Sequence, residues 1–284
     1  MKDEFYLNET GMTLDYPFAD IELARRLERT EARGNADFVE ARAKAFPDRC
    51  AMWIEVAGTY AMFDGVGSPL TQTFGLGVFE PVTVTHIETL EQFFRSRSAD
   101  VFHEVCPLAD NTVFTLFGER GYRPVEFSNV LYRPISQDLR LQASINERVN
   151  VRVVERNEIN LWAETASAGW SEFPEVKDFM REVGQVSAVS NSLSFLAQLD
   201  RQPIATGTLI IADDVALLAG ASTIPRARRQ GAQLALLEGR LRYAAAHGCT
   251  VAMMVAQPGS GSQRNAERHG FRIAYTRTKW TRIY

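Results

Sequence analysis

Three arginines and one glycine around the start of a predicted helix are the residues of this chain best placed to bind a ligand. Arg226, Arg228 and Arg229 follow an apolar strand that ends near Ala221, and Gly231 directly precedes an amphipathic helix. Helix N-termini carry partial positive charge and unpaired N–H groups, so they stabilise anions by about 0.3–1 kcal/mol and disfavour cations. A docked anion would stabilise the arginines, and a glycine lets it approach the backbone. Solvated arginines on a surface turn are the alternative, but the combination favours a phosphate or pyrophosphate site.

Residues 228–233, RRQGAQ, resemble the acyl-CoA-binding segment of the GNAT superfamily of N-acetyltransferases, whose usual form is R/Q-x-x-G-x-G/A. Pro225 before the segment and the apolar run LALL after it add to the resemblance. Gln233 departs from the pattern, because the family has Gly or Ala there, and its longer side chain is expected to narrow the pyrophosphate cradle. The resemblance implies acetyl-CoA as co-substrate.

The resemblance also implies which residues contact the coenzyme. The pantetheine arm is expected along the end of the strand, and the pyrophosphate against the backbone amides of the helix start, with Arg228 or Arg229 pairing with a phosphate. Two residues on the facing loop and helix are further polar candidates, for which helix capping is the alternative. The expected contacts are Ser222, Thr223, Ile224, Arg228, Arg229, Gln230, Gly231, Ala232, Gln233, Ser260 and Asn265.

The acceptor and catalytic residues are less defined by the sequence. The loop between the first two helices of a GNAT domain commonly lines the acceptor pocket, which points to Trp170, Glu172 and Phe173. Glu172 is a candidate to attract or deprotonate a cationic amine, and a solvated loop carboxylate is its alternative. Family members often use a tyrosine as acid four residues before a late Gly-Phe pair, but this chain has Ala266 there, and Tyr275 lies beyond the motif. Apart from Glu172, the catalytic residues are unknown.

The reaction expected from this resemblance is the direct attack of a small-molecule amine on the thioester of acetyl-CoA. Two other functions stay open. One is the transfer of aminoacyl units from tRNA, as in a tandem GNAT-like group, although the acidic charge balance opposes it. The other is a non-catalytic acyl-CoA-binding or sensing protein, which the missing tyrosine and the missing strand carboxylate support.

The elements of the second half must position these residues. A strand over 151–154, helices over 157–168 and 176–182, a hairpin of 195–200 with 203–211, and a strand over 215–221 lead to the arginine turn. In the following helix, the spacing predicts a buried face of Leu234, Leu237, Leu241 and Ala244, with Arg240 and Arg242 elsewhere on its surface. A buried strand over 250–255, a helix over 262–268 capped by Ser262, and a last strand ending near 280 complete this half.

The first half has the same order of elements. Two helices over 21–33 and 37–46, a hairpin of 51–56 with 59–63, a strand over 74–79, a helix over 85–97, a strand over 101–105, a helix over 111–119 and a strand over 125–132 are predicted. Thr85 and Glu88 form a T-x-x-E capping box, which would satisfy the helix N–H groups and exclude a phosphate. Gly75 and Gly77 fit a strand at a close backbone approach. Residues 68–72 could reach over the cleft of the second half.

A repeated local pattern indicates a duplication. Gly121 and Gly270, 149 residues apart, each stand between a short helix and the last strand of a half and are followed by an aromatic residue and an arginine. The expected fold class is α/β (α+β) with two GNAT-like domains, each a mixed, mostly antiparallel twisted sheet flanked by helices. We place them at residues 1–135 and 149–284, joined by a charged linker over 136–148, with the first domain degenerate.

Composition narrows the classes of partner. The 284 residues carry a formal net charge of −4 with 45% hydrophobic residues, which is typical of a soluble protein and disfavours nucleic acid as a partner. No apolar stretch fits a signal peptide or a membrane span, so a cytoplasmic protein without a membrane partner is expected. The three cysteines and four histidines form no metal-ligating pattern, and no metal is expected. A homodimer is left open.

Overall fold

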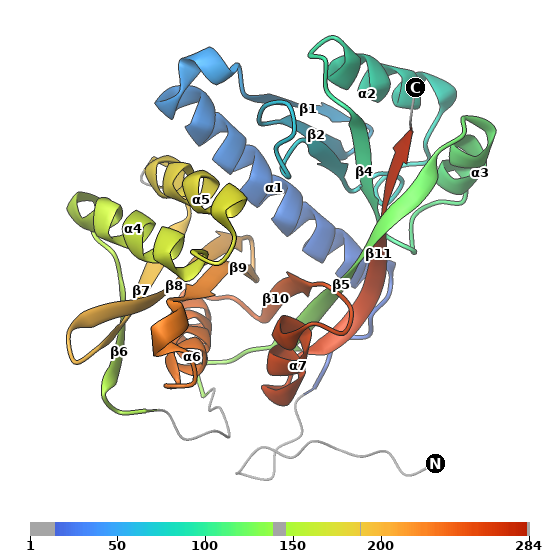
Figure 1. Cartoon of the computed structure of the whole chain (residues 1–284). Coiled ribbons are helices and arrows are strands. Elements are labelled where there is room, and N and C mark those ends of the chain that lie inside the picture. Colours follow the sequence, from blue (N-terminus) through green and yellow to red (C-terminus); the bar gives the residue numbers. More distant parts are fainter. Residues whose placement is uncertain (1–14, 139–145, 188, 283–284) are drawn as a thin grey trace.

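One twisted sheet of 11 strands runs through both halves of the chain, with helices on both of its faces (Figure 1). The computed structural model describes residues 15–138, 146–187 and 189–282, and within these it describes the backbone but not the side chains of residues 174–178. The predicted linker over 136–148 lies partly outside the described residues. The mixed, mostly antiparallel sheet with flanking helices confirms the expected fold class.

The first half supplies five strands and three α-helices among its described residues. Helix α1 begins after Asp20, whose carboxylate accepts hydrogen bonds from the backbone N–H groups of Glu22 and Leu23 at 3.0 Å. The elements are α1 (Ile21–Ala45), the 3-10 turn η1 (Pro47–Arg49), β1 (Met52–Val56), β2 (Thr59–Phe63), β3 (Gln72–Phe74), α2 (Val84–Arg95), β4 (Val101–Val105), α3 (Thr112–Glu119) and β5 (Arg123–Pro134).

The second half has a similar order of elements, with an additional strand, β6, and two helices, α4 and α5, before its first hairpin. Its elements are β6 (Val149–Val153), η2 (Arg156–Glu158), α4 (Ile159–Gly169), α5 (Pro174–Ser187), β7 (Leu193–Leu199), β8 (Gln202–Ala212), β9 (Val215–Thr223), η3 (Pro225–Ala227), α6 (Ala232–Ala246), β10 (Val251–Ala256), α7 (Gly261–Arg268) and β11 (Arg272–Arg282). The strands of this half lie within a few residues of the predicted ranges.

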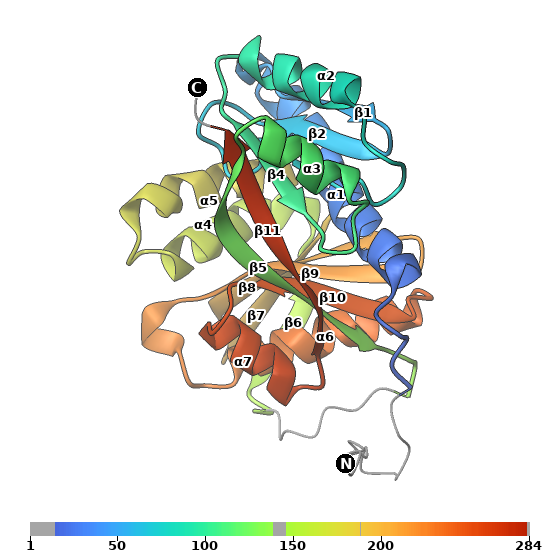
Figure 2. The ribbon, with the colours of Figure 1, turned by 90° about the vertical axis from the view of Figure 1, so that its right-hand side faces the viewer.

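The two halves exchange their last strands. The order across the sheet is β1-β2-β3-β4-β11-β5-β10-β9-β8-β7-β6. Strand β5, which ends the first half, therefore pairs with β10 of the second half, while β11, which ends the second half, pairs with β4 of the first. The two strands cross the middle of the molecule side by side (Figure 2). The division into residues 1–135 and 149–284 stays a prediction, since the sheet is continuous across it.

Side-chain alternation in the central strands packs the two faces against different helices. Leu217 and Met253 lie in one apolar cluster with Leu27 of α1, whereas Leu218 and Ala252 lie in another with residues of α6. Successive residues of a strand point to opposite faces of the sheet. Helices α1 and α6 therefore cover opposite faces of β9 and β10.

Residues 21–45 form one helix, so the prediction of two helices was wrong. Gly34 lies inside α1, where a Cβ atom would come within 3.0 Å of the Ile210 side chain on β8. The glycine lets α1 pack closely on the sheet, and this contact stabilises the helix against the usual cost of a glycine, about 1 kcal/mol.

Two further local predictions were wrong. The third strand covers Gln72–Phe74, and the chain turns where residues 75–79 were expected to continue it. Gly77 does lie at a close approach, because a Cβ atom there would be 2.4 Å from Val113. Helix α7 is capped by Ser260, whose Oγ accepts from the N–H of Gln263 at 3.1 Å, and not by Ser262.

The repeated glycine turn is present in both halves. Gly121 and Gly270 have φ values of 74° and 78° and follow α3 and α7. In each turn the next aromatic residue donates its backbone N–H to the helix five residues before it: Tyr122 to Phe117 at 2.9 Å and Phe271 to Ala266 at 3.1 Å. Helices α3 and α7 thus end with the same glycine turn and the same hydrogen bond, which supports the interpretation of the two halves as a duplication.

Candidate coenzyme and acceptor site

The turn between β9 and α6 presents backbone N–H groups without side-chain acceptors. After η3 the chain passes through Arg229, with φ of 62°, to Gly231, with φ of 83°, which is the N-cap of α6. No side chain in the described part of the chain caps this helix. Left-handed backbone suits glycine, and a Cβ atom at Gly231 would also lie 3.2 Å from that of Asn146. Uncapped helix starts of this kind can bind anions, and an anion site here stays a prediction.

The three arginines of this turn differ in their partners. Arg228 forms an ion pair with Glu172 of the α4–α5 loop. Arg226 and Arg229 are exposed and have no carboxylate partner within the described ranges. The Gln230 carbonyl is held by Asn146, whose side-chain amide donates to it at 3.0 Å. The turn is thus fixed in place, with cationic groups left to meet an anion.

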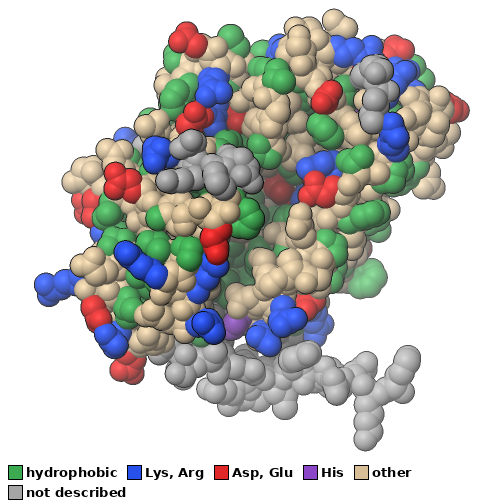
Figure 3. Space-filling model, in the orientation of Figure 1, with side chains coloured by type: hydrophobic (Ala, Val, Ile, Leu, Met, Phe, Trp, Pro, Cys, Tyr) green, Lys and Arg blue, Asp and Glu red, His purple; other side chains and the backbone are tan. Residues whose placement is uncertain are grey.

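A cleft opens beside this turn, where β9 and β10 stop pairing. The two strands are parallel neighbours only over residues 215–217 and 251–253. Beyond them lies a cleft of about 500 Å³ lined by Trp170, Leu218, Ala219, Gly220, Ala221, Gln233, Leu237, Arg240, Met254, Val255, Gly261, Ser262, Asn265 and Ala266. The space-filling view shows a hollow near the middle of this face of the molecule (Figure 3). Separated strands leave backbone groups available for an extended ligand.

A bulge in β9 shapes the wall of the cleft. The β8–β9 register shifts between the pairs Thr206–Ser222 and Thr208–Ala219, and Gly220 in the bulge has φ of 59°. Bulges turn the backbone and its side chains locally. This one lies on the β9 segment that borders the cleft.

Arg240 is buried under this bulge, so its expected place on the helix surface was wrong. Its side chain is 4% exposed, and its Nη1 donates to the carbonyl oxygens of Thr208 at 3.1 Å and Ala219 at 3.3 Å. Burial lowers its pKa to about 10, so it stays charged at neutral pH. The missed signal is the spacing of Gln233, Leu237 and Arg240, which places them on one face of a helix.

The expected coenzyme contacts divide into two groups in the structure. Gln233 and Asn265 line the cleft, and Gln233 also donates to Thr223 at 2.7 Å. The hydroxyl of Ser222 is buried and interacts with Thr206 at 3.0 Å, away from the cleft. The hydroxyl of Ser260 caps α7. The backbone N–H of Ile224 donates to Ile204 at 2.9 Å.

The acceptor-loop residues lie at one end of the cleft. Trp170 lines the cleft, and its ring packs edge-on against Phe173 with centroids 6.0 Å apart. Its Nε1 is buried and has no hydrogen-bond partner in the described part of the chain. Glu172 pairs with Arg228, which ties this loop to the arginine turn. The ion pair therefore brings the aromatic residues of this loop next to the arginine turn.

The cleft offers few groups for proton transfer. Ala266 is buried where a family tyrosine is common, and Tyr275 donates its hydroxyl to Glu28 at 2.8 Å in the core of the first half. Among the lining residues that the structure describes, Arg240 is the one titratable side chain. Glu172 is the nearest carboxylate that the sequence suggested, and it lies on the neighbouring loop.

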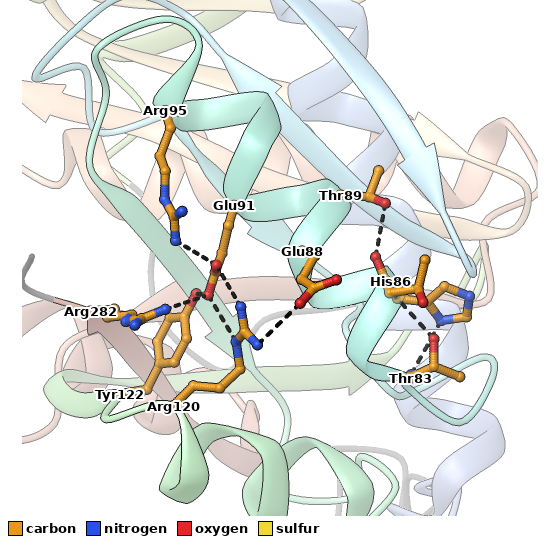
Figure 4. Close-up of polar contacts among 10 residues, drawn as sticks. Thr83, His86, Glu88, Thr89, Glu91, Arg95, Arg120, Tyr122 and Arg282 are labelled. Carbon is orange, nitrogen blue, oxygen red and sulfur yellow. Dashed lines mark hydrogen bonds and ion pairs between the residues drawn. The ribbon is translucent and has the colours of Figure 1, made fainter.

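The corresponding helix of the first half is closed by its own side chains. Thr83, and not Thr85, is the N-cap of α2: its Oγ1 accepts from the N–H of His86 at 3.2 Å, and His86 Nδ1 accepts from the N–H of Thr83 at 3.4 Å (Figure 4). The Thr85–Glu88 box was therefore wrong by two residues, although a capping box is present at this helix. Leu76 and Val78 are buried beside this helix. The first half has no open anion site at this helix.

Residues 68–72 lie elsewhere than expected. All of them except Leu70 line a second cavity of about 390 Å³, together with Glu126 of β5 and Lys279 of β11. They are not among the residues lining the cleft beside β9. Within residues 15–138, 146–187 and 189–282, no group of acidic, histidine or cysteine side chains could hold a metal ion, and no helix is long and apolar enough to cross a membrane.

Comparisons with known proteins agree with this geometry. The model of the Acetyltransferase (GNAT) family matches residues 159–271. A GCN5-related N-acetyltransferase from Kribbella flavida has a similar structure, with a TM-score of 0.63 and 21% identity over 92% of this chain and 96% of that chain. A tandem GNAT protein from the clavulanic acid biosynthesis pathway has a TM-score of 0.57 and 10% identity over 94% of this chain and 96% of that chain. No curated protein matches the sequence.

The chain therefore carries a domain of the GNAT family in its second half. Over its whole length it has the fold of a tandem GNAT protein, as the resemblance implied.

Proposed function

We propose that this protein is an N-acyltransferase that moves an acetyl group from acetyl-CoA to the amine of a small molecule. The observation that supports this most is the uncapped, arginine-rich start of α6, which continues directly into the cleft between β9 and β10. A diphosphate and an extended arm need these two features side by side. We also propose that the chain divides into units of residues 1–135 and 149–284, and that the protein acts in the cytoplasm.

The chain's own residues suit each part of the coenzyme. The amides of residues 229–233 and the side chains of Arg226 and Arg229 would hold the diphosphate, and Arg228 would exchange Glu172 for a phosphate oxygen. The arm would follow the freed edge of β9 into the cleft. The acyl carbonyl would reach the bulge at Gly220, where backbone N–H groups can polarise it.

The acceptor would enter beside Trp170 and Phe173. Attack requires an uncharged amine, and Glu172 is the carboxylate we propose to attract the ammonium form and accept its proton, directly or through water. The reaction forms the C–N bond of an amide and breaks the C–S bond of the thioester. Free coenzyme thiol and the N-acetyl product are released.

A binding function without turnover is the second candidate. It is supported by the cleft's described lining, in which no other titratable side chain accompanies Arg240. Acetyl-CoA binding by calorimetry and thiol release across a panel of primary amines separate the two. Thiol release above the hydrolysis rate with any amine supports the transferase, binding without release supports the sensor, and absence of binding refutes both.

A further inference from the structure

Arg240 is a buried cation without a counterion. Its Nε donates to the Leu236 carbonyl at 3.1 Å, and its Nη1 donates to two further carbonyls of the β8–β9 bulge. Within the described residues, no carboxylate pairs with it and Nη2 has no hydrogen-bond partner. The nearby acid on its own helix, Glu238, is paired with Arg242 at 2.5 Å.

The cleft is the side from which this charge can be neutralised. Arg240 lines the cleft, and the other described lining side chains, from β9, β10, α6, α7 and the α4–α5 loop, are uncharged. A buried charge without a partner is strongly unfavourable, so an arginine kept there points to an anion that occupies the cleft. The bonds to the two bulge carbonyls fix the guanidinium in advance, as electrostatic stabilisation of a developing charge requires.

The coenzyme diphosphate cannot be that anion. Arg240 is nine residues after Gly231 on α6, which is about 14 Å along a helix axis at about 1.5 Å per residue. An anion held by the helix start therefore lies too far away for the guanidinium to contact it. The partner must form deeper in the cleft, next to the bulge.

We propose that Arg240 stabilises the thiolate of coenzyme A as it leaves, an inference that rests on the acyl transfer proposed above. The amine nitrogen attacks the thioester carbon and forms the C–N bond, and the C–S bond breaks with its electron pair passing to sulfur. The nitrogen loses its proton to Glu172 or water. The sulfur then carries a full negative charge beside the fixed guanidinium until solvent protonates it.

The test compares the binding of coenzyme A and desulfo-coenzyme A, which lacks the sulfur atom, by calorimetry from pH 6 to 9.5. In the unaltered protein the thiol of bound coenzyme A should have a pKa about one unit below its ordinary value, read directly from thiolate absorbance. Coenzyme A should then bind about tenfold tighter relative to its desulfo analogue at high pH than at pH 6.

Three variants test whether Arg240 causes the pH-dependent preference for coenzyme A over its desulfo analogue. Arg240→Met should abolish the pH-dependent preference, and Arg240→Lys should keep part of it because it keeps the charge. Arg242→Met, an exposed cation on the same helix, is the matched control and should behave as the unaltered protein. If Arg240→Met does not fold, the thiol pKa of coenzyme A bound to the unaltered protein and to Arg240→Lys decides the question.

Two results would overturn the inference. One is a normal thiol pKa in the bound coenzyme, or a lowered pKa that persists in Arg240→Met. The other is a preference for succinyl-CoA over acetyl-CoA that disappears in Arg240→Met while the thiol pKa is unchanged, which would assign the guanidinium to a carboxylate on the acyl chain. Failure of the unaltered protein to bind coenzyme A or its desulfo analogue would instead refute the proposed function.

Discussion

Replacing Gly231 by aspartate places a negative charge at the anion site. With a diphosphate charge roughly 5 Å away and an effective dielectric constant of about 20, the repulsion is about 3 kcal/mol for each unit of charge before screening by salt. Even half of this lowers affinity by more than tenfold. We therefore expect Gly231→Asp to weaken acetyl-CoA binding by at least about 100-fold, since the diphosphate carries more than one charge.

The same substitution should change stability little. The backbone of Gly231 has φ of 83°, which costs an ordinary residue about 1–2 kcal/mol, and a Cβ atom 3.2 Å from that of Asn146 requires a small adjustment. A carboxylate near the positive end of α6 recovers up to about 1 kcal/mol. The melting temperature should fall by a few degrees at most.

Gly231→Asn is the matched control, because it has the same shape without the charge. Acetyl-CoA affinity is measured by titration calorimetry for all three proteins, with thermal melts to confirm folding. We expect the asparagine variant to lose about tenfold or less, so that most of the aspartate effect is electrostatic. Unchanged affinity in folded Gly231→Asp, or equal losses in both variants, would refute an anion site at this helix.

Three other substitutions test the charges described above. Glu172→Gln frees Arg228 from an exposed ion pair and should raise acetyl-CoA affinity by up to about fivefold in calorimetry. The same substitution should lower the rate of thiol release. An unchanged rate would show that Glu172 takes no part in the proposed proton transfer. Arg95, Arg120 and Arg282 form ion pairs at 2.5–3.2 Å with the one carboxylate of Glu91 (Figure 4). Glu91→Gln should therefore destabilise the fold by about 3–5 kcal/mol in urea melts. A loss under about 1 kcal/mol would contradict that role. Burial raises the pKa of Glu31 from 4.5 to about 6, so the folded state holds this proton more tightly than the unfolded state. The stability gained from this proton, about 2 kcal/mol, is lost as pH rises from about 4.5 to 6. Glu31→Gln should remove this loss from urea melts measured across that range, and an unchanged loss would show that another group causes it.

Local features of the site could be read from the sequence. The strand before the arginine turn and the glycine at the helix start depend on a few neighbouring residues, and the structure has them at the predicted place. Helix ends were less certain, because Thr83 and Thr85, or Ser260 and Ser262, satisfy the same short-range pattern. Packing of the preceding residues decides between such pairs.

Features that depend on distant contacts were missed. The continuity of α1 depends on Ile210, far along the chain, which fills the space over Gly34. The burial of Arg240 depends on carbonyl groups that a bulge in another strand leaves unpaired. A charged residue next to an apolar stripe is usually solvated, so its sequence context gave the opposite indication.

The exchange of the last strands explains why a half without an open coenzyme site is part of the same sheet. Strand β10 forms one wall of the cleft, and along its full length, Val251 to Ala256, it pairs with β5 of the first half. Without the first half, β10 would lose this ladder on its edge opposite β9, and β11 would lose both of its neighbours, β4 and β5. Unpaired edges of this kind are unstable and prone to aggregation. The first half thus stabilises the strand that shapes the cleft. This role requires no ligand at α2, where Thr83 and His86 cap the helix start themselves.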